Sequence, residues 1–487
     1  MEYAERLGSI ARECITREEL QKLIDEGIEP LALAQVIQGR IDAKPGVLLG
    51  SMQSPNTHIP IKIPDSLRDR HMYIIGRSGS GKTNLIRIMA MQDALRGNGF
   101  GMLAPEQELL TEEILPYVPE ERIDDIVYFD PTSPHPIPLN PLYLDEDADI
   151  DLCVDDNLTI FQRLMGESQA RMDEILRQSL YALMERPNST LLDIEKLLSR
   201  TDDTLRQEII RTTSDEQTRY FFESTYPAFP RDAHLPITTR INRLVRPRAI
   251  RNLLCQPGKS FNFRDAMDTG KILLFSLPDG ILGEQTAQLL GQLIVSRIQL
   301  ATLSRMDSAR ASRRPFYLYL DEFQTFIGVA ETSYSKLLSR GRKYAFGLIL
   351  AHQNTGQITK EILDNILGNV TTMITFGVAY GDAMRLSQQY IMKMGNEMKP
   401  LPTEELVSQK VGEAIGRVGQ TVFTLSTPLA PQEPDHERAA SIIERSAQNY
   451  SGIATASRFT AKVKRVAPKL LPEVGGNGRV EPDEVFE

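Results

Sequence analysis

One short segment limits the folds open to this chain more than any other part of its sequence. It reads Gly76-Arg77-Ser78-Gly79-Ser80-Gly81-Lys82-Thr83 and matches the pattern G-x-x-x-x-G-K-[ST]. Residues 71–75 before it form an apolar run that predicts a buried strand, and the apolar spacing after Lys82 predicts a helix packed on a sheet. The order strand, glycine-rich loop, helix is the context in which this pattern binds phosphate. The chain is therefore predicted to be an α/β protein with a mostly parallel central sheet.

Each part of the segment meets a separate requirement of a bound nucleoside triphosphate. The glycines let backbone N–H groups converge on phosphate oxygens, Lys82 neutralises the β- and γ-phosphates, and the Thr83 hydroxyl binds Mg²⁺. We therefore expect ATP and Mg²⁺ as cofactors. The predicted nucleotide-binding residues are Gly76, Arg77, Ser78, Gly79, Ser80, Gly81, Lys82, Thr83 and Asn84.

Such a site also requires a carboxylate at the end of a neighbouring strand. Residues 316–320 are an apolar run that leads into Asp321 and Glu322. We predict that Asp321 holds Mg²⁺ through water and that Glu322 polarises the attacking water as general base. A capped strand end with two solvated acids is the alternative. An acid pair in tandem favours hydrolysis over transfer of phosphate to a second small molecule.

A further apolar run, residues 346–351, ends in His352 and Gln353. The amide of Gln353 is predicted to sense the γ-phosphate, and this residue joins Lys82, Asp321 and Glu322 in the predicted catalytic set. A plain strand terminus is the alternative for Gln353. For His352, packing or hydrogen bonding inside the fold is the favoured interpretation.

The remaining periodicity divides the chain into regions. Strands are predicted at residues 46–50, 59–64, 100–103, 125–129, 272–277 and 370–376, mostly as near-continuous apolar runs typical of parallel strands. Helical periodicity dominates between about 145 and 255. The predicted domains are an N-terminal helical segment (1–45), a discontinuous nucleotide-binding motor (46–144 and 256–430), an all-α insertion (145–255), and a C-terminal helix with a disordered basic tail (431–487).

Composition indicates the cellular compartment in which the chain works. The chain has 487 residues, a formal net charge of -10 and three cysteines without C-x-x-C spacing, which fits a reducing compartment and argues against a structural zinc site. Its apolar runs are too short to cross a bilayer, and the charged first thirty residues lack a signal core. We therefore expect a cytoplasmic protein without a membrane anchor of its own.

Three segments together resemble the FtsK and HerA class of P-loop ATPases, and most closely the conjugative coupling proteins of type IV secretion. They are the strand ending in Asp321-Glu322, the run Ser339-Arg340-Gly341-Arg342-Lys343, and Leu350-Ala351-His352-Gln353. The resemblance covers roughly residues 46–430. It implies a RecA-like core that carries a helical insertion.

The resemblance also implies a homohexameric ring that moves DNA through a central channel with nucleotide bound between subunits. Arg342 would then be an arginine finger that reaches a neighbour's γ-phosphate, with Arg340 as the alternative finger. A basic helix face that is solvated or touches DNA is the other interpretation of both arginines. Implied partners are DNA, other copies of the chain, and a secretion channel, relaxosome or nuclease, with recruitment to the inner face of the membrane.

Two features depart from the family pattern. The strand after the P-loop helix usually ends in Asp-Pro, whereas here the sequence reads Ala104-Pro105-Glu106, so the role of that acid is open. The N-terminal transmembrane segment of many coupling proteins is also missing. We therefore expect recruitment by a partner or work away from the envelope.

Two basic clusters are candidates for DNA contact without base reading. The first comprises Arg240, Arg243, Arg246, Arg248 and Arg251, and the second comprises Arg458, Lys462, Lys464, Arg465 and Lys469. A solvated or salt-bridged face is the alternative for both. Two other functions stay open: a secretion ATPase that acts on protein, which the negative net charge favours, and a HerA-like partner of a nuclease in DNA processing or phage defence. The strand pair between residues 46 and 64 is small for a HerA barrel.

Overall fold

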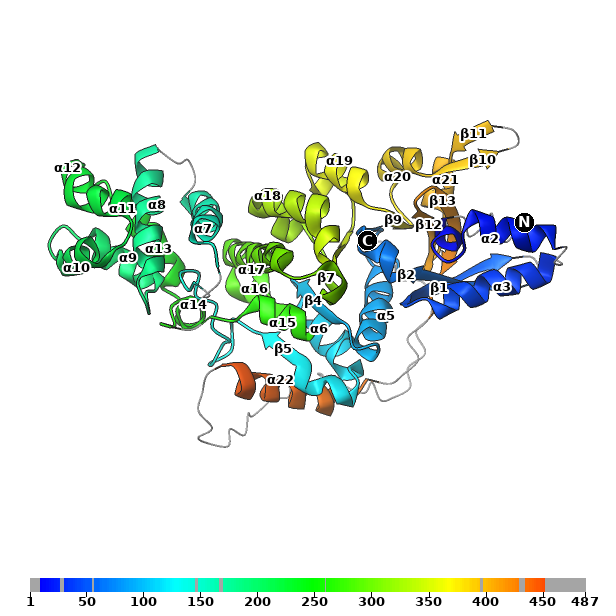
Figure 1. Ribbon diagram of the computed structural model, residues 1–487, viewed down its shortest axis with the longest axis horizontal. Helices are drawn as coiled ribbons and strands as arrows, with labels where there is room; N and C mark the ends of the chain where they lie inside the picture. Colours follow the sequence, from blue (N-terminus) through cyan, green and yellow to red (C-terminus); the bar gives the residue numbers. More distant parts are fainter. Residues whose placement is uncertain are drawn as a thin grey trace, which may run out of the picture. The chain divides into compact units, whose positions relative to one another are not determined.

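A single large sheet organises the computed structural model, which describes residues 9–26, 30–54, 57–144, 148–165, 170–258, 260–394, 397–428 and 434–451 (Figure 1). The sheet has 11 strands in the order β2-β1-β13-β12-β9-β3-β8-β7-β4-β6-β5. Its parallel part comprises β9 (Thr372–Phe376), β3 (Met72–Ile75), β8 (Phe346–His352), β7 (Phe316–Leu320), β4 (Gly99–Ala104), β6 (Ile272–Ser276) and β5 (Ile126–Phe129).

Every residue of these parallel strands is buried. Helices cover both faces, so an apolar side chain is favourable at each position and the strands are apolar without interruption. The prediction of an α/β fold with a mostly parallel sheet is confirmed.

An antiparallel extension continues the sheet beyond β9. It consists of β12 (Glu413–Val418), β13 (Thr421–Ser426), β1 (Gly46–Ser54) and β2 (Thr57–Pro64). Along β13, buried residues alternate with more exposed ones, because this part of the sheet is open on one side. The apolar runs in the sequence predict β1 and β2 but not β12, β13 or the separate hairpin of β10 (Ile391–Met394) and β11 (Glu397–Pro400).

Two hydrophobic cores lie on opposite faces of the sheet, and successive strand residues alternate between them. In β3, Met72 and Ile74 point into one core, while Tyr73 and Ile75 point into the other. The first core includes residues from α3 (Pro30–Ala43), α5 (Lys82–Leu95), α6 (Gln107–Glu113) and α22 (His436–Tyr450). The second includes residues from α15 (Phe263–Thr269), α17 (Glu284–Ser304), α18 (Gln324–Arg340), α19 (Lys360–Asn369) and α20 (Tyr380–Leu386).

The described residues between 148 and 258 contain helices and no strand. The α-helices are α7 (Ile150–Met165), α8 (Ala170–Glu185), α9 (Leu191–Leu198), α10 (Thr204–Thr212), α11 (Glu216–Tyr220), α12 (Tyr226–Ala228), α13 (Leu235–Val245) and α14 (Arg248–Leu254), with a π-helical turn at Phe221–Thr225 between α11 and α12. They share the second core with the sheet, and the Ser296 hydroxyl of α17 donates to Asp156 of α7 at 2.9 Å. Because all described residues belong to one compact unit, the division into domains stays a prediction.

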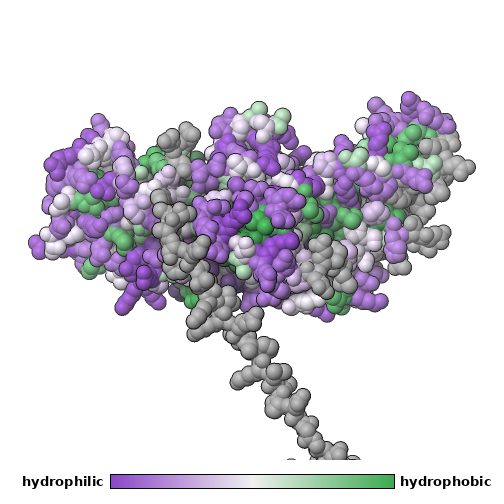
Figure 2. All heavy atoms as spheres, turned by 90° about the horizontal axis from the view of Figure 1, so that it is seen from below, coloured by the Kyte–Doolittle hydropathy of each residue, from purple (hydrophilic) through white to green (hydrophobic). Residues whose placement is uncertain are grey.

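The last described helix, α22, packs beside the edge strand β5. The Ser446 hydroxyl accepts a hydrogen bond from the Tyr128 backbone N–H at 2.8 Å. The predicted disordered tail and its basic cluster lie outside the described residues. The face shown in Figure 2 is mostly hydrophilic, with hydrophobic residues in separate small areas.

None of the helices in the described parts of the chain is long and apolar enough to cross a membrane.

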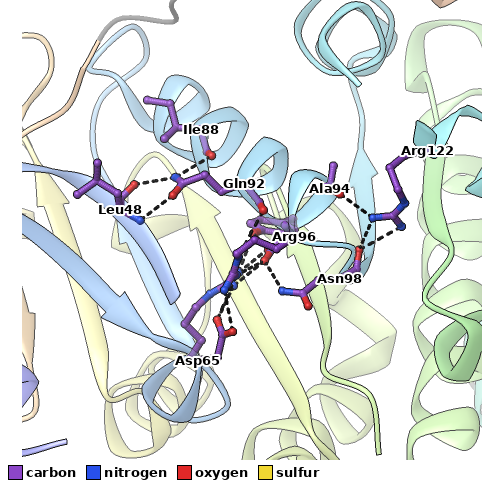
Figure 3. Close-up of polar contacts among 11 residues, drawn as sticks. Leu48, Asp65, Ile88, Gln92, Ala94, Arg96, Asn98 and Arg122 are labelled. Carbon is purple, nitrogen blue, oxygen red and sulfur yellow. Dashed lines mark hydrogen bonds and ion pairs between the residues drawn. The ribbon is translucent and has the colours of Figure 1, made fainter. Parts of the chain in front are cut away.

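Polar contacts fix the C-terminal end of α5, the helix that follows the glycine-rich loop (Figure 3). The Gln92 amide pairs with both backbone groups of Leu48 in β1 at 2.8 Å, and the Arg96 guanidinium binds Asp65 at 2.8 Å. Arg122 donates to the Ala94 carbonyl at 2.7 Å. These contacts tie the end of α5 to three other segments of the chain.

Beneath this end of α5 lies a buried ion pair. Asp93 is 0% exposed and accepts from both terminal nitrogens of Arg68, at 2.7 and 2.6 Å, and from the Tyr319 hydroxyl of β7 at 2.5 Å. Arg68 is 1% exposed, and its guanidinium lies 3.6 Å from the centre of the Tyr317 ring, also of β7. The helix after the glycine-rich loop is therefore anchored to β7, the strand that directly precedes Asp321.

Candidate nucleotide-binding site

The glycine-rich loop connects β3 to α5 at the carboxyl end of the parallel sheet. Gly79 and Gly81 have φ angles of +71° and +116°, which favour glycine over any residue with a side chain. Gly76 has no room for a side chain, because an added Cβ would lie 2.6 Å from Cβ of Phe376. The loop therefore needs glycine at these positions to turn tightly before the first residue of α5, Lys82.

The side chain of Lys82 folds back onto the glycine-rich loop. Its side chain is 5% exposed, and its ammonium group donates to the carbonyl oxygens of Gly76 at 2.8 Å and Arg77 at 3.1 Å. Burial lowers the pKa of Lys82, while the charges of Glu322 and Asp321 act to raise it. The structure thus brings the loop lysine and the two acids into one site.

Asp321 directly follows β7, two strands away from β3 in the sheet. Its side chain is 8% exposed. Burial raises the pKa of Asp321 to about 6, the charges of Glu322 and Glu106 add to the rise, and Lys82 opposes it. A cation bound here would stabilise the carboxylate, so the electrostatics fit a metal-binding role.

Glu322 adopts a left-handed backbone conformation with φ of +45°, which is rare for a residue other than glycine. Its backbone N–H donates to Asp321 Oδ1 at 3.0 Å. Such strained residues often occur at functional sites. The conformation places both carboxylates in one tight turn after β7.

Both oxygens of the Glu322 carboxylate accept hydrogen bonds from glutamine amides. Gln353, which follows β8, donates to Oε1 at 2.9 Å, and Gln324, the first residue of α18, donates to Oε2 at 2.7 Å. The sequence predicted that Gln353 belongs to this site. Gln324 was not predicted, although its position two residues after Glu322 was the available signal.

His352 is fully buried beside the same site. Its ring Nε2 forms a short hydrogen bond with the Tyr73 hydroxyl, and its ring centre lies 4.7 Å from that of Phe323. Burial lowers the pKa of His352 to about 3, and the nearby charge of Lys82 acts in the same direction. The structure therefore places His352 in the packing role that the sequence analysis favoured.

The other predicted nucleotide-binding residues differ in their surroundings. Ser78 is exposed, Thr83 is half-buried, and the buried Ser80 hydroxyl has no hydrogen-bond partner within the described part of the chain. Arg77 donates to the Val378 carbonyl at 2.6 Å, behind the loop. The Asn84 amide donates to the Pro428 carbonyl at 2.9 Å, so this side chain contacts protein rather than the interior of the loop.

Arg340 and Arg342 are exposed and precede the amino end of the central strand β8. Arg342 belongs to the short 3₁₀ helix of residues Gly341–Tyr344, which precedes β8, whereas the glycine-rich loop follows the carboxyl end of the parallel strand β3. The structure does not bring these arginines to Lys82 of the same chain.

Glu106 is exposed and precedes α6, directly after β4. Its charge acts to raise the pKa of Asp321, after the larger effects of burial and of Glu322. The acid that departs from the Asp-Pro pattern is therefore close enough to influence the predicted metal-binding residue.

Known proteins resemble this chain in structure but not detectably in sequence. No protein-family model matches the sequence, and none of the curated proteins matches it. Among solved structures, the plasmid coupling protein TrwB in complex with ADP and Mg²⁺ superimposes with a TM-score of 0.53 and 15% identity, over 78% of this chain and 90% of TrwB. VirB4 of Thermoanaerobacter pseudethanolicus gives a TM-score of 0.55 and 16% identity, over 80% of this chain and 98% of VirB4.

This chain has the α/β fold of the coupling protein TrwB and of VirB4. The same likeness is seen with the unbound form of the bacterial coupling protein TrwB, at a TM-score of 0.53 and 14% identity. The resemblance expected from the strand ending in Asp321-Glu322 and from residues 350–353 is thus confirmed at the level of the fold.

Within the residues that the structure describes, no three His, Cys, Asp or Glu side chains gather in a way that could hold a metal ion. A metal at this site would need ligands of other kinds, such as a hydroxyl, water or phosphate oxygens. Mg²⁺ commonly binds through one or two protein ligands, several waters and substrate phosphates.

Proposed function

We propose that this chain is an ATP-hydrolysing motor that moves DNA. The observation that carries the proposal is the convergence of Lys82 with Asp321 and Glu322 at the carboxyl ends of the parallel strands β3 and β7, which β8 separates in the sheet. The phosphate-binding loop, the metal-binding acid and the general base of a P-loop ATPase are then all present. The fold likeness to TrwB, whose structure contains ADP and Mg²⁺, supports the choice of ligand.

Each residue has a separate role in this proposal. Lys82 would leave the loop carbonyls that it contacts here to bind the β- and γ-phosphates, and Thr83 and Asp321 would hold Mg²⁺, which would supply positive charge to the phosphate oxygens. Glu322 accepts a proton from the attacking water. Gln353 already touches Glu322, so a shift of its amide toward the γ-phosphate would couple nucleotide state to the base.

Assembly and DNA contact extend the proposal. Arg342 lies near the amino ends of the parallel strands, whereas the loop of its own chain follows their carboxyl ends, so it can serve as a finger only for a neighbouring copy, as in a homohexameric ring. In the arginine cluster of α13 and α14, Arg243, Arg246, Arg248 and Arg251 are exposed and Arg240 is half-buried. Ion pairs between these arginines and described acidic residues are absent, which leaves their charge available for phosphates.

Steady-state ATPase activity of the purified chain, with Mg²⁺ and with or without double-stranded DNA, tests the proposal. Glu322→Gln serves as the blank, because loss of a general base lowers turnover by about 10²- to 10⁴-fold while leaving the nucleotide bound. A several-fold rise with DNA that is absent in Glu322→Gln supports a DNA motor. An activity that Lys82→Ala leaves intact would contradict the assignment of the site.

An ATPase that acts on protein rather than DNA is the second candidate. The formal charge of -10 favours it, because a chain of this sign repels nucleic acid except at local basic surfaces. Turnover that is unchanged by single- or double-stranded DNA at low salt would support this candidate. In either case we propose a cytoplasmic protein with the domain boundaries predicted from the sequence.

A further inference from the structure

We propose that Gln324 positions the water that attacks the γ-phosphate, in addition to holding the base Glu322. This inference rests on the proposed ATPase function. It concerns a residue that neither the glycine-rich loop motif nor the acid pair contains.

The first observation is the orientation of the Gln324 amide. An ionised carboxylate can only accept hydrogen bonds, so the group of Gln324 that lies 2.7 Å from Glu322 Oε2 must be its NH₂ group. The amide oxygen therefore points away from Oε2. The contact with Glu322 fixes which end of the amide faces the base.

The second observation is that this amide oxygen lacks a partner. Oε1 of Gln324 is buried, and no hydrogen-bond donor among the described residues reaches it. A buried acceptor without a partner is destabilising, and buried polar groups are nearly always paired. A partner that belongs to the working enzyme, such as a water molecule, would account for it.

The third observation is rigidity of the backbone on both sides. Phe323 is fully buried, and its N–H donates to the Ala351 carbonyl of β8 at 3.1 Å. The Thr325 N–H donates to the Glu322 carbonyl at 2.9 Å. Gln324 thus extends from a turn that is anchored to the sheet, which suits a side chain that must orient a reactant.

These features give the amide two functions in one step. The water oxygen forms a bond to the γ-phosphorus while the bond from phosphorus to the bridging oxygen breaks. One water proton passes to Glu322, and the other is held by Oε1 of Gln324. A water held by two acceptors has its lone pair directed at the phosphorus, as a water-positioning glutamine achieves in other P-loop enzymes.

The test uses Gln324→Met, which keeps the length of the side chain and removes both the NH₂ group and the oxygen of the amide. The matched control is Gln288→Met in α17, because the Gln288 amide also donates to a carboxylate, Glu284 at 3.0 Å, but away from the candidate site. We expect kcat for ATP to fall by about 30- to 100-fold in Gln324→Met, within the range for a positioned acid–base group. The KM for ATP, the Kd for ADP and the thermal midpoint should stay close to those of the control.

The outcomes separate this inference from the function on which it rests. If wild type shows no Lys82-dependent ATP hydrolysis, both are wrong. If wild type hydrolyses ATP and Gln324→Met turns over as Gln288→Met does, or loses ADP affinity in parallel with kcat, only the role of Gln324 is wrong. If Gln324→Met does not fold, Gln324→Asn keeps the amide on a shorter side chain, and the inference then requires a fall in kcat at unchanged KM.

Discussion

The buried ion pair between Arg68 and Asp93 allows a quantitative prediction about stability. Asp93 is fully buried and Arg68 is 1% exposed, so Asp93→Asn would remove the bidentate counter-charge of a buried guanidinium and leave it only the partly buried Asp65, at 3.2 Å. Removing one partner of such a pair costs about 3–5 kcal/mol. The Tyr319 hydroxyl, which donates to the same carboxylate, would also lose a strong acceptor.

This free energy converts into a thermal shift. A compact unit that ends at Gly452 unfolds with an entropy of about 0.9 kcal/mol/K, at about 2.1 cal/mol/K per residue. A loss of about 3–5 kcal/mol therefore lowers the midpoint by about 3–5 °C. Differential scanning calorimetry of the purified chain at neutral pH measures this directly.

An exposed ion pair provides the control. The contact between Arg177 and Asp155 is also short, at 2.6 Å, but the two side chains are 38% and 60% exposed. Asp155→Asn should therefore cost about 0–1 kcal/mol and leave the midpoint nearly unchanged. Equal shifts for Asp93→Asn and Asp155→Asn would refute the reasoning that burial makes the Arg68 contact important.

Three other predictions concern the loops around the sheet and the site. Ala345→Gly should raise stability by about 0.5–1 kcal/mol in thermal melts, because Ala345 has a φ of +55° and glycine adopts this conformation without strain; an unchanged or lower midpoint would contradict this. The pKa of Asp321 is raised to about 6 from an ordinary value of about 3.9, so the free energy of unfolding should fall as pH rises from about 4 to about 6. In thermal melts with EDTA, Asp321→Asn should therefore have a higher midpoint than wild type at pH 8 but not at pH 4. A difference in midpoint that does not change with pH would refute the effect. Mixing Arg342→Ala with Lys82→Ala chains should restore part of the ATPase activity if Arg342 acts on a neighbour's site, whereas absence of rescue at every ratio would exclude the arginine finger.

The parallel core of the fold was predictable because its strands are apolar at every position. Residues 316–320 and 346–351 were predicted as strands and form β7 and β8 with bounds that differ by one residue at most. The strand β13 was missed because one side of this part of the sheet is open, so polar residues alternate with apolar ones; β12 (Glu413–Val418) is mostly buried but is interrupted by Gly416 and Arg417, which break the apolar run. In β13, for example, Phe423 is buried and Thr424 is exposed.

Only those residues of the candidate site that belong to sequence motifs could be predicted. Asp321 and Glu322 follow an apolar strand, and the carboxyl ends of parallel strands lie on the same side of a sheet. Their position in the sequence was therefore enough to predict that they lie near Lys82. The position of Gln324 two residues after Glu322 made it a candidate, but its contact with Glu322 could not be predicted, because the direction of the Gln324 side chain depends on the left-handed turn at Glu322. The hydrogen bond from the Asn84 amide to the Pro428 carbonyl could not be predicted either, because these residues are distant in sequence.

The pairing of β1 with β13 has a consequence for how the chain is made. Ser51 of β1 lies opposite Ser426 of β13, and the Ser9 backbone N–H donates at 2.7 Å to the hydroxyl of Thr421, a residue 412 positions later. On the ribosome, β1 and β2 emerge long before the strand that completes their side of the sheet. Until residue 426 has been synthesised, one edge of β1 remains open to strands of other chains. Folding of the N-terminal part therefore waits for nearly the whole chain, and we expect nascent chains to depend on chaperones during that interval.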